Sequence, residues 1–244
     1  MFNPSIKLTL VLLVLLLIFL RLGWWQLERK EEKHQLFEAF AAAPLLQIEE
    51  ALDRGEKFAR IEARGHYDPE RSVLLDNKIH NGRAGVHVLT PFRLEDGTWL
   101  LVNRGWLPIP PDRRSLPEVV TDGDSRTISG ILNQPSTGGQ RIGDADILVS
   151  DQWPQLITYF ELVSINEALG IELEPWIVQL DAGDQTGFEG RQWKAAVMEP
   201  KMHGAYALQW FALAAAALVI WIVLGIRRAQ ALTEKTKQPM KTEK

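Results

Sequence analysis

The 244-residue chain contains no cysteine. No disulfide can hold it together, so a folded domain has to rely on its apolar core. The absence also excludes thiolate metal sites, including the paired-cysteine sites of copper carriers. Any metal that the chain binds must therefore be held by other side chains.

The sequence also lacks the common signatures of catalysis and of nucleotide binding. It has no Gly-x-Ser-x-Gly, no His-Glu-x-x-His and no glycine-rich phosphate loop. Its five histidines form no close pair, and its net charge is −4, with no strongly basic region in the middle of the chain. We therefore expect a protein that is not an enzyme and that does not bind nucleic acid.

Charged residues are absent from two long apolar runs, residues 8–20 and 206–226. A helix crosses a bilayer with about 20 apolar residues, so 206–226 is predicted to be a transmembrane helix. The first run reaches that length over residues 6–26 if Lys7 and Arg21 extend their charges to the two membrane surfaces. A cleaved signal peptide is the alternative, but no small-residue cleavage site directly follows the run, which favours an uncleaved anchor.

Two membrane helices place both termini on one side of the membrane. The basic tail, residues 227–244, favours the cytoplasm, although basic residues also follow the first run and bring the count close to a tie. Because a long loop has little weight in this rule, we expect residues 1–5 and 227–244 in the cytoplasm and the middle of the chain outside it. No Arg- and Ser-rich transit segment precedes the first run, which favours a bacterial protein.

The middle of the chain, residues 27–205, has the pattern of one mainly β domain. The first helix is expected to continue beyond the membrane towards Pro44. Ser164 and Glu167 fit a capping box, and Gly170 fits the end of the helix that it would start. Short strands are expected at residues 58–66, 72–76, 85–94, 99–103, 127–132, 156–162 and 176–180. The predicted fold class is a membrane-anchored α+β protein, with two transmembrane helices flanking one mainly β domain.

One histidine is notable for its position, because His203 lies just before the second apolar run. On a helix, His203, Tyr206 and Trp210 would share a face. Together with Trp24 and Trp25, these aromatic side chains would form a belt at one membrane surface. A neutral imidazole there can be an axial ligand of haem iron. The residues alone favour the simpler interpretation, an interfacial histidine without a ligand.

Further polar residues near this surface complete the hypothetical haem site. Arg29 could meet the propionates of a haem. Gln26 and Gln209 could form hydrogen bonds where the helices emerge, and the gap between the helix ends could shelter the macrocycle.

Two methionines near His203 suggest a different metal. Met198 and Met202 could join it in a copper(I) site. Because Pro200 interrupts a regular helical face, this is the weaker interpretation.

A second motif, Asn103-Arg104-Gly105-Trp106, ends the strongest predicted strand. An arginine followed by glycine and tryptophan at a strand end suits a buried ion pair or a docking surface for a partner. An arginine that braces a turn is the simpler interpretation, so we treat these residues as a partner or structural motif.

Five segments of the chain together resemble the surfeit-locus-protein-1 family of cytochrome c oxidase biogenesis factors. They are GWWQLER at 23–29, GHYD at 65–68, GVHVLTPF at 85–92, VNRGWLP at 102–108 and HGAYALQWF at 203–211. Any one of them is weak, but their order between two apolar runs is specific, and the resemblance covers almost the whole chain.

The resemblance implies a periplasmic domain with cytoplasmic termini in a bacterial inner membrane. It implies a role in assembling the haem–copper oxidase, by delivering haem a to the catalytic subunit or inserting it there. Other oxidase subunits and haem a synthase are further expected partners, besides the lipid bilayer. Some bacterial members are thought to bind haem a through the histidine that matches His203, so haem a is an expected, transient ligand.

Two other classes of function are weighed against haem delivery. A scaffold would dock and stabilise oxidase subunits without binding haem. A sensor is disfavoured, because the 18 residues after the second run leave no room for an output domain.

Overall fold

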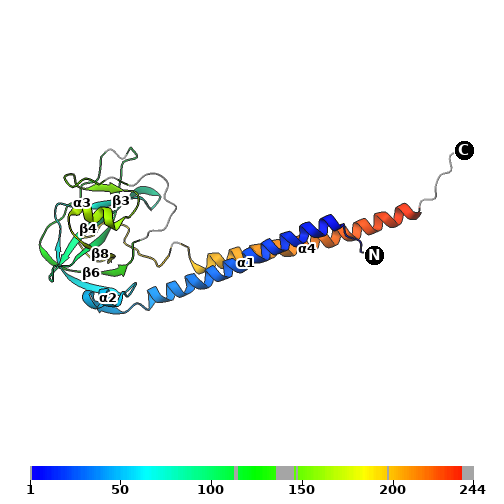
Figure 1. Ribbon diagram of the computed structural model, residues 1–244, viewed down its shortest axis with the longest axis horizontal. Helices are drawn as coiled ribbons and strands as arrows, with labels where there is room; N and C mark the ends of the chain where they lie inside the picture. The colour runs from blue at the N-terminus through cyan, green and yellow to red at the C-terminus, as the bar shows by residue number, and fades with distance from the viewer. Residues whose placement is uncertain (1, 113–114, 136–145, 147, 197, 238–244) are drawn as a thin grey trace. The chain divides into compact units, whose positions relative to one another are not determined.

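The structure is a computed structural model that describes residues 2–112, 115–135, 146, 148–196 and 198–237. The chain divides into two compact units: a helical unit of residues 1–41 and 195–244, and a sheet unit of residues 42–194. In Figure 1 the helical unit is blue at the start of the chain and yellow to red at its end.

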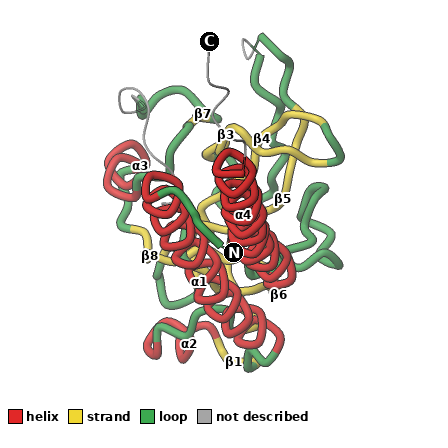
Figure 2. Tube along the Cα trace, turned by 90° about the vertical axis from the view of Figure 1, so that its right-hand side faces the viewer, coloured by secondary structure: helices red, strands yellow, loops and turns green. Residues whose placement is uncertain are grey.

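The helical unit is an antiparallel pair of long helices, α1 (Ile6–Ala41) and α4 (Pro200–Lys237). The inward residues of α1 recur at alternating intervals of four and three positions, and include Leu12, Leu16, Phe19, Gly23 and Gln26. Those of α4 follow the same rule and include His203, Ala207, Trp210 and Ala214. This spacing is that of a left-handed coiled coil, and the two helices lie side by side in Figures 1 and 2.

Specific contacts fix the register of the pair. Nε1 of Trp221 donates a hydrogen bond to Oγ1 of Thr9 over 3.1 Å. Gly23 faces Phe211, where an added Cβ would lie 2.6 Å from Cε1 of the ring. A residue without a side chain is therefore needed for the helices to approach this closely.

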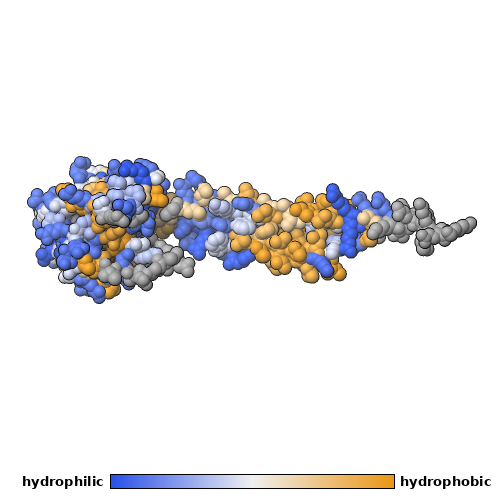
Figure 3. Space-filling view, turned by 90° about the horizontal axis from the view of Figure 1, so that it is seen from above, coloured by the Kyte–Doolittle hydropathy of each residue, from blue (hydrophilic) through white to orange (hydrophobic). Residues whose placement is uncertain are grey.

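Apolar side chains cover the outside of the pair as well as its seam. Leu17 is 70% exposed and Ile220 is 57% exposed. Figure 3 shows a band of hydrophobic residues along the visible face of the pair, with hydrophilic residues on both sides. Both helices are long and apolar enough to cross a membrane. The continuation of the first helix is confirmed, because α1 runs to Ala41, shortly before Pro44.

The sheet unit contains, among its described residues, two short helices and eight strands. The helices are α2 (Ile48–Arg54) and α3 (Leu162–Leu169). The strands are β1 (Leu45–Gln47), β2 (Arg60–Tyr67), β3 (Val73–His80), β4 (Arg83–Leu94), β5 (Trp99–Pro108), β6 (Ser125–Asn133), β7 (Gln155–Ile157) and β8 (Leu173–Leu180). They form one sheet in the order β1-β2-β6-β8-β5-β4-β3-β7.

A further pairing between β2 and β4 closes part of this sheet into a barrel of β2, β6, β8, β5 and β4. Tyr67 lies opposite Phe92 in this pairing, and Gly65 lies opposite Leu94. A Cβ at Gly65 would collide with the carbonyl of Arg93, so the glycine permits the closure. The barrel strands pair antiparallel, except for β5 with β8.

The core of the sheet unit lies on both faces of the barrel wall. Each barrel strand sends alternate apolar residues into the interior, among them Ile61, Phe92, Leu100, Ile128 and Val178. Helix α2 adds residues to this inner cluster. Helix α3 packs on a second cluster, formed by the opposite faces of β5 and β8 with β3 and β7. The prediction of a mainly β domain with few helices is confirmed.

Two local predictions need correction. Helix α3 begins at Leu162 after Glu161, so Ser164 lies inside it and its Oγ bonds the Glu161 carboxylate instead of capping the backbone. The strand expected at 156–162 is shorter in the structure. It is β7, which ends at Ile157, because the chain then leads into helix α3. Strand β1 and helix α2 were not predicted, since both are too short to show periodicity. Gly170 ends α3 in a left-handed conformation, as expected.

Candidate functional site

His203 lies in the first turn of α4, on the side of the helix that faces α1. Pro200 begins the helix, where its missing N–H costs nothing. His203 is 9% exposed, and Ala207, one turn further on, is 1% exposed. The histidine is therefore enclosed by the helical pair.

A hydrogen bond to Gln26 of α1 orients the His203 ring. Nδ1 of His203 lies 2.9 Å from Oε1 of Gln26. An amide oxygen only accepts hydrogen bonds, so Nδ1 carries the proton in this arrangement. The lone pair of the neutral ring is then on Nε2, which is buried and has no hydrogen-bond partner in the described structure. A buried polar atom without a partner is uncommon and calls for a functional explanation.

The aromatic residues predicted around His203 separate into two groups. Trp210 faces α1, where its ring stacks on Phe19 with centroids 5.9 Å apart. Tyr206 is 42% exposed and turns away from the seam, so it does not share the face of His203. The reason is the spacing of four and three along the seam, which places Ala207 inward in its place. Trp24 and Trp25 are exposed on α1.

The other predicted site residues are engaged or exposed. Nη1 of Arg29 contacts Oε2 of Glu32 at 2.5 Å, and its guanidinium lies 5.9 Å from the Trp25 ring centroid. Gln209 is exposed on α4. The helices touch at Gly23 and again at Gln26, so the expected gap between them is closed here.

The copper interpretation gains no support. Met202 is 44% exposed, whereas its neighbour His203 points into the seam. Successive helical residues diverge by about 100°, so the two do not converge on one ion.

The described donor atoms fit haem ligation by His203. Iron needs a ring nitrogen with a free lone pair, and ligand histidines usually donate their other N–H to an oxygen acceptor. Nε2 and the bond to Gln26 meet both conditions. Because Nε2 is covered by protein, iron can reach it only if the ring turns outward or the helices part at this level.

The second predicted motif lies in the sheet unit, where β5 passes through Asn103 to Trp106. Nδ2 of Asn103 lies 3.2 Å from Nδ1 of His87, and its Oδ1 accepts from the backbone N–H of Gly105. Gly105 has φ +111°, and an added Cβ would lie 2.5 Å from the carbonyl oxygen of Glu189. Trp106 is 1% exposed, and its Nε1 donates to the carbonyl of Lys78.

Burial also controls the protonation of His87. It lowers the pKa of His87 from 6.5 to about 4, with smaller contributions from Lys78 and His80. The ring is therefore neutral near pH 7, and its Nδ1 can accept from Asn103.

Arg104 is buried in the same corner, at 4% exposure. It braces the chain by donating to the carbonyl of Thr186 and the hydroxyl of Thr121. These contacts fit the simpler interpretation of the motif as a structural brace. Docking of a partner on it stays a prediction.

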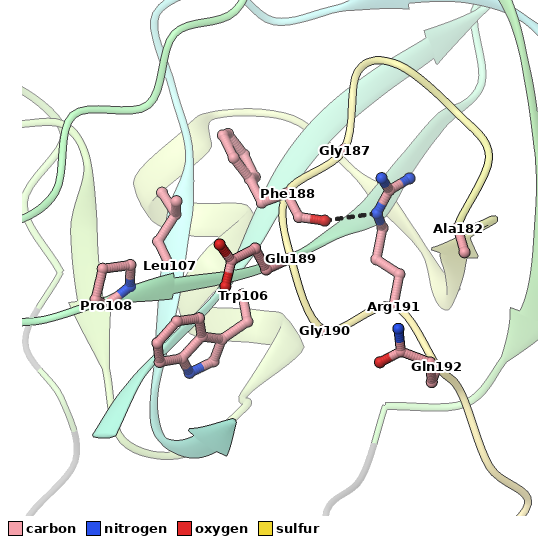
Figure 4. Close-up of a pocket in the computed structure, with 10 residues that line it drawn as sticks. All are labelled: Trp106, Leu107, Pro108, Ala182, Gly187, Phe188, Glu189, Gly190, Arg191 and Gln192. Carbon is pink, nitrogen blue, oxygen red and sulfur yellow. Dashed lines mark hydrogen bonds between the residues drawn. The ribbon is translucent and has the colours of Figure 1, made fainter. Parts of the chain in front are cut away.

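A hollow of about 520 Å³ borders the end of β5. Figure 4 shows the residues that line it, which are residues 106–108, Ala182 and residues 187–192. Trp106 pairs with Glu189 across it, and Nε of Arg191 donates to the carbonyl of Phe188. The loop of residues 187–191 was not singled out from the sequence, and the glycines at 187 and 190 were its only signal.

The chain matches known proteins along most of its length. A model of the SURF1 family matches residues 13–215. A SURF1-like protein of Rickettsia felis is 24% identical over 227 residues, which cover 89% of this chain and 96% of that protein. A SURF1-like protein of Monosiga brevicollis is 28% identical, with 83% and 82% covered. Surfeit locus protein 1 of Xenopus tropicalis is 25% identical, with 85% and 72% covered.

These matches confirm the resemblance that the five segments carry. The family model spans most of α1, the whole sheet unit and the part of α4 that contains His203. The chain therefore belongs to the SURF1 family, and this membership implies a role in the assembly of cytochrome c oxidase.

Proposed function

We propose that this protein is a non-enzymatic assembly factor that carries haem a to the catalytic subunit of cytochrome c oxidase. The supporting observation is His203, whose Nδ1 is bonded to Gln26 while its buried Nε2 has no partner. Haem a is cargo in this proposal, held through its iron by Nε2. A single histidine ligand suits a carrier, because the cargo has to leave again.

Exposed side chains of α1 that lie close in the sequence to Gln26, the hydrogen-bond partner of His203, would hold the rest of the haem. Trp24 and Trp25 offer apolar rings at the surface of α1. Arg29 would meet a propionate after leaving Glu32, to which it is bonded in this structure. Haem a synthase would hand over the haem, and the oxidase subunits would receive it.

The two long helices would anchor the protein in a bacterial inner membrane. Their length and hydropathy support this anchoring, and Arg227 and Arg228 at the end of the apolar part of α4 support a cytoplasmic tail. The sheet unit would then lie in the periplasm.

A scaffold without haem is the second candidate, and it is favoured because iron cannot reach Nε2 unless the ring or the helices move. In that case the bond between His203 and Gln26 would serve only to join the two helices. The sheet unit would dock oxidase subunits and keep them together during assembly.

The amount of haem a in the oxidase separates these functions. Cells that lack their own SURF1-family protein would receive the native chain, His203→Ala or the matched control Leu218→Ala, an exposed site on the same helix. Haem a per catalytic subunit would then be measured in the purified oxidase. We expect the native chain and the control to restore full occupancy, and His203→Ala to leave the subunit largely without haem a.

The same experiment contains the result that would reject the carrier. If His203→Ala restores full haem occupancy at equal protein level, His203 is not the ligand. A lower yield of oxidase with normal haem content in cells without the protein would favour the scaffold.

A further inference from the structure

The sheet unit contains a buried cation that has no carboxylate partner in the described part of the chain. Arg104 is 4% exposed. Its Nε lies 2.8 Å from the carbonyl oxygen of Thr186, Nη1 lies 2.5 Å from Oγ1 of Thr121, and Nη2 lies 3.3 Å from the carbonyl oxygen of Val120. All three acceptors are neutral, so they solvate the charge without cancelling it.

Two aromatic rings complete the surroundings of Arg104. The centroids of Tyr67 and Phe188 lie 4.9 Å and 4.8 Å from the guanidinium carbon. Ring faces attract a cation, but they also leave its charge in place. Burial lowers the pKa of Arg104 from its ordinary value, and Tyr67 opposes that effect. Asp184, which is not part of the cavity lining, also opposes it, and the loss of water is the larger effect.

A second arginine lies beside the same ring. The guanidinium carbon of Arg126 is 5.7 Å from the Tyr67 centroid, and its Nη2 is bonded to Asp122. Its Nε is buried and has no hydrogen-bond partner in the described structure. An unsatisfied buried N–H is costly, so an acceptor for this N–H would be favourable.

Both arginines line one cavity of about 480 Å³, with residues 120–122 and 185–188 and the Tyr67 ring as its other walls. This volume is within the range of small-ligand pockets, which is about 300–1,000 Å³. The lining holds two positive groups, Arg104 and Arg126, and one negative group, Asp122, which leaves one positive charge in excess.

We propose that this cavity binds a carboxylate carried on an aromatic or apolar stem. Nε–H of Arg126, which has no partner in the described structure, would donate to the carboxylate, and the guanidinium charges would favour the anion. The Tyr67 and Phe188 rings would contact the stem. The single negative charge of a carboxylate balances the one positive charge in excess in the lining. The two negative charges of a phosphate dianion would exceed that positive charge and lie beside Asp122. The site lies wholly in the sheet unit and is independent of haem binding at His203.

Ligand-observed fluorine NMR on the detergent-purified full chain tests this proposal. The probes are 4-fluorophenylacetate, the tripeptide Gly-Gly-(4-fluoro)Phe with a free C-terminus, and the same tripeptide with an amidated C-terminus. We expect line broadening for at least one free acid and none for the amide. The acid that binds tells whether the carboxylate comes from a small molecule or from the end of a protein chain. Inorganic phosphate, added as a competitor, should displace neither acid at equal concentration.

Matched arginine variants assign the binding to this cavity. Arg126→Gln should weaken binding about tenfold or more, since it removes a charged hydrogen-bond donor. Arg64→Gln is the control, because Arg64 is an exposed arginine of the sheet unit that pairs with Glu95 outside the cavity. Arg104→Gln should abolish binding. If that variant does not fold, Arg104→Lys takes its place in the test.

Three results would overturn the proposal. One is that neither free acid binds the native chain. Another is that the amide binds as well as the free acid. The third is that Arg126→Gln binds like the Arg64→Gln control.

Discussion

Gln26 and His203 lie 177 positions apart in the chain and share a hydrogen bond of 2.9 Å across the helical pair. The bond has two consequences that follow from one geometry. It places the proton on Nδ1 and leaves the Nε2 lone pair free. It also places one polar pair in a seam of mostly apolar and small residues, and such pairs fix the register of packed helices.

Replacing Gln26 by Leu should release the His203 ring. Nδ1–H would lose its acceptor in a buried position, which costs about 1–3 kcal/mol. We expect a lower thermal midpoint for the helical unit and a mixture of ring tautomers, measured by the ¹⁵N shifts of His203. Gln209→Leu, on the exposed side of α4, should change neither quantity. An unchanged tautomer and midpoint in Gln26→Leu would show that the hydrogen bond does not orient the ring.

Cysteine pairs can test the register of the helices, because the native chain has no cysteine of its own. Nε1 of the Trp221 indole reaches Thr9, so Thr9→Cys with Trp221→Cys should be joined by a short bifunctional thiol reagent, which spans more than the Cβ separation of about 4 Å in a disulfide. The control is Leu10→Cys with Trp221→Cys, since Leu10 is 59% exposed on another side of α1. The crosslinked fraction is read on non-reducing gels. Equal crosslinking of the two pairs would contradict the register.

Much of the helical unit could be predicted from the sequence. The apolar runs predicted its two helices, and the charged but periodic stretch after Trp25 predicted the continuation of α1. The pairing of Gln26 with His203 could not be obtained in this way, because it depends on the relative register of two helices far apart in the chain. That Ala207 faces inward, and not Tyr206, also depends on how the two helices pack, so it could not be predicted either.

The sheet unit was predictable as strands but not as a barrel. The alternation in residues 85–94 and 99–103 gave β4 and β5, since a period of two is a local signal. Closure depends on the pairing of Gly65 with Leu94 and on the parallel pairing of β5 with β8. Both are non-local contacts without a sequence signal. Likewise, Arg104 was recognised as a candidate, but its ring partner Phe188 lies in an irregular loop more than 80 residues later.

The Gly105→Ala substitution should destabilise the sheet unit strongly. Gly105 has φ +111°, and its added Cβ would lie 2.5 Å from the backbone oxygen of Glu189. Strain of this kind costs on the order of 1–3 kcal/mol before the clash is counted. Gly183→Ala is the matched control, because a Cβ there meets no atom within 4 Å. Urea unfolding followed by tryptophan fluorescence would compare them, and similar midpoints would refute the proposed strain.

The sheet unit should lose stability in mild acid because of His87. Its folded pKa is lowered to about 4, first by burial, whereas the unfolded residue titrates near 6.5. Between these values only the unfolded chain takes up the proton. The stabilisation is therefore complete above about pH 6.5 and is lost as the pH falls towards 4, by roughly 3 kcal/mol in all.

The histidine variants show whether His87 is the group responsible. Urea unfolding between pH 7.5 and 4.5 should have a shallower pH dependence in His87→Gln than in the native chain. His66→Gln, at an exposed histidine, should keep the native slope. A native slope in His87→Gln would assign the acid sensitivity to other groups.

The central claim is that His203 binds haem iron through Nε2. The most direct test is the reduced absorption spectrum of the detergent-purified protein after co-expression with the enzymes that make haem a. Native protein, His203→Ala and the control Leu218→Ala, at an exposed residue of α4, would be compared at equal protein concentration, with circular dichroism to verify folding. The account predicts a haem a band in the native protein and in Leu218→Ala, and a much weaker band in His203→Ala. A folded native protein without the band, or a band of equal strength in His203→Ala, would contradict it.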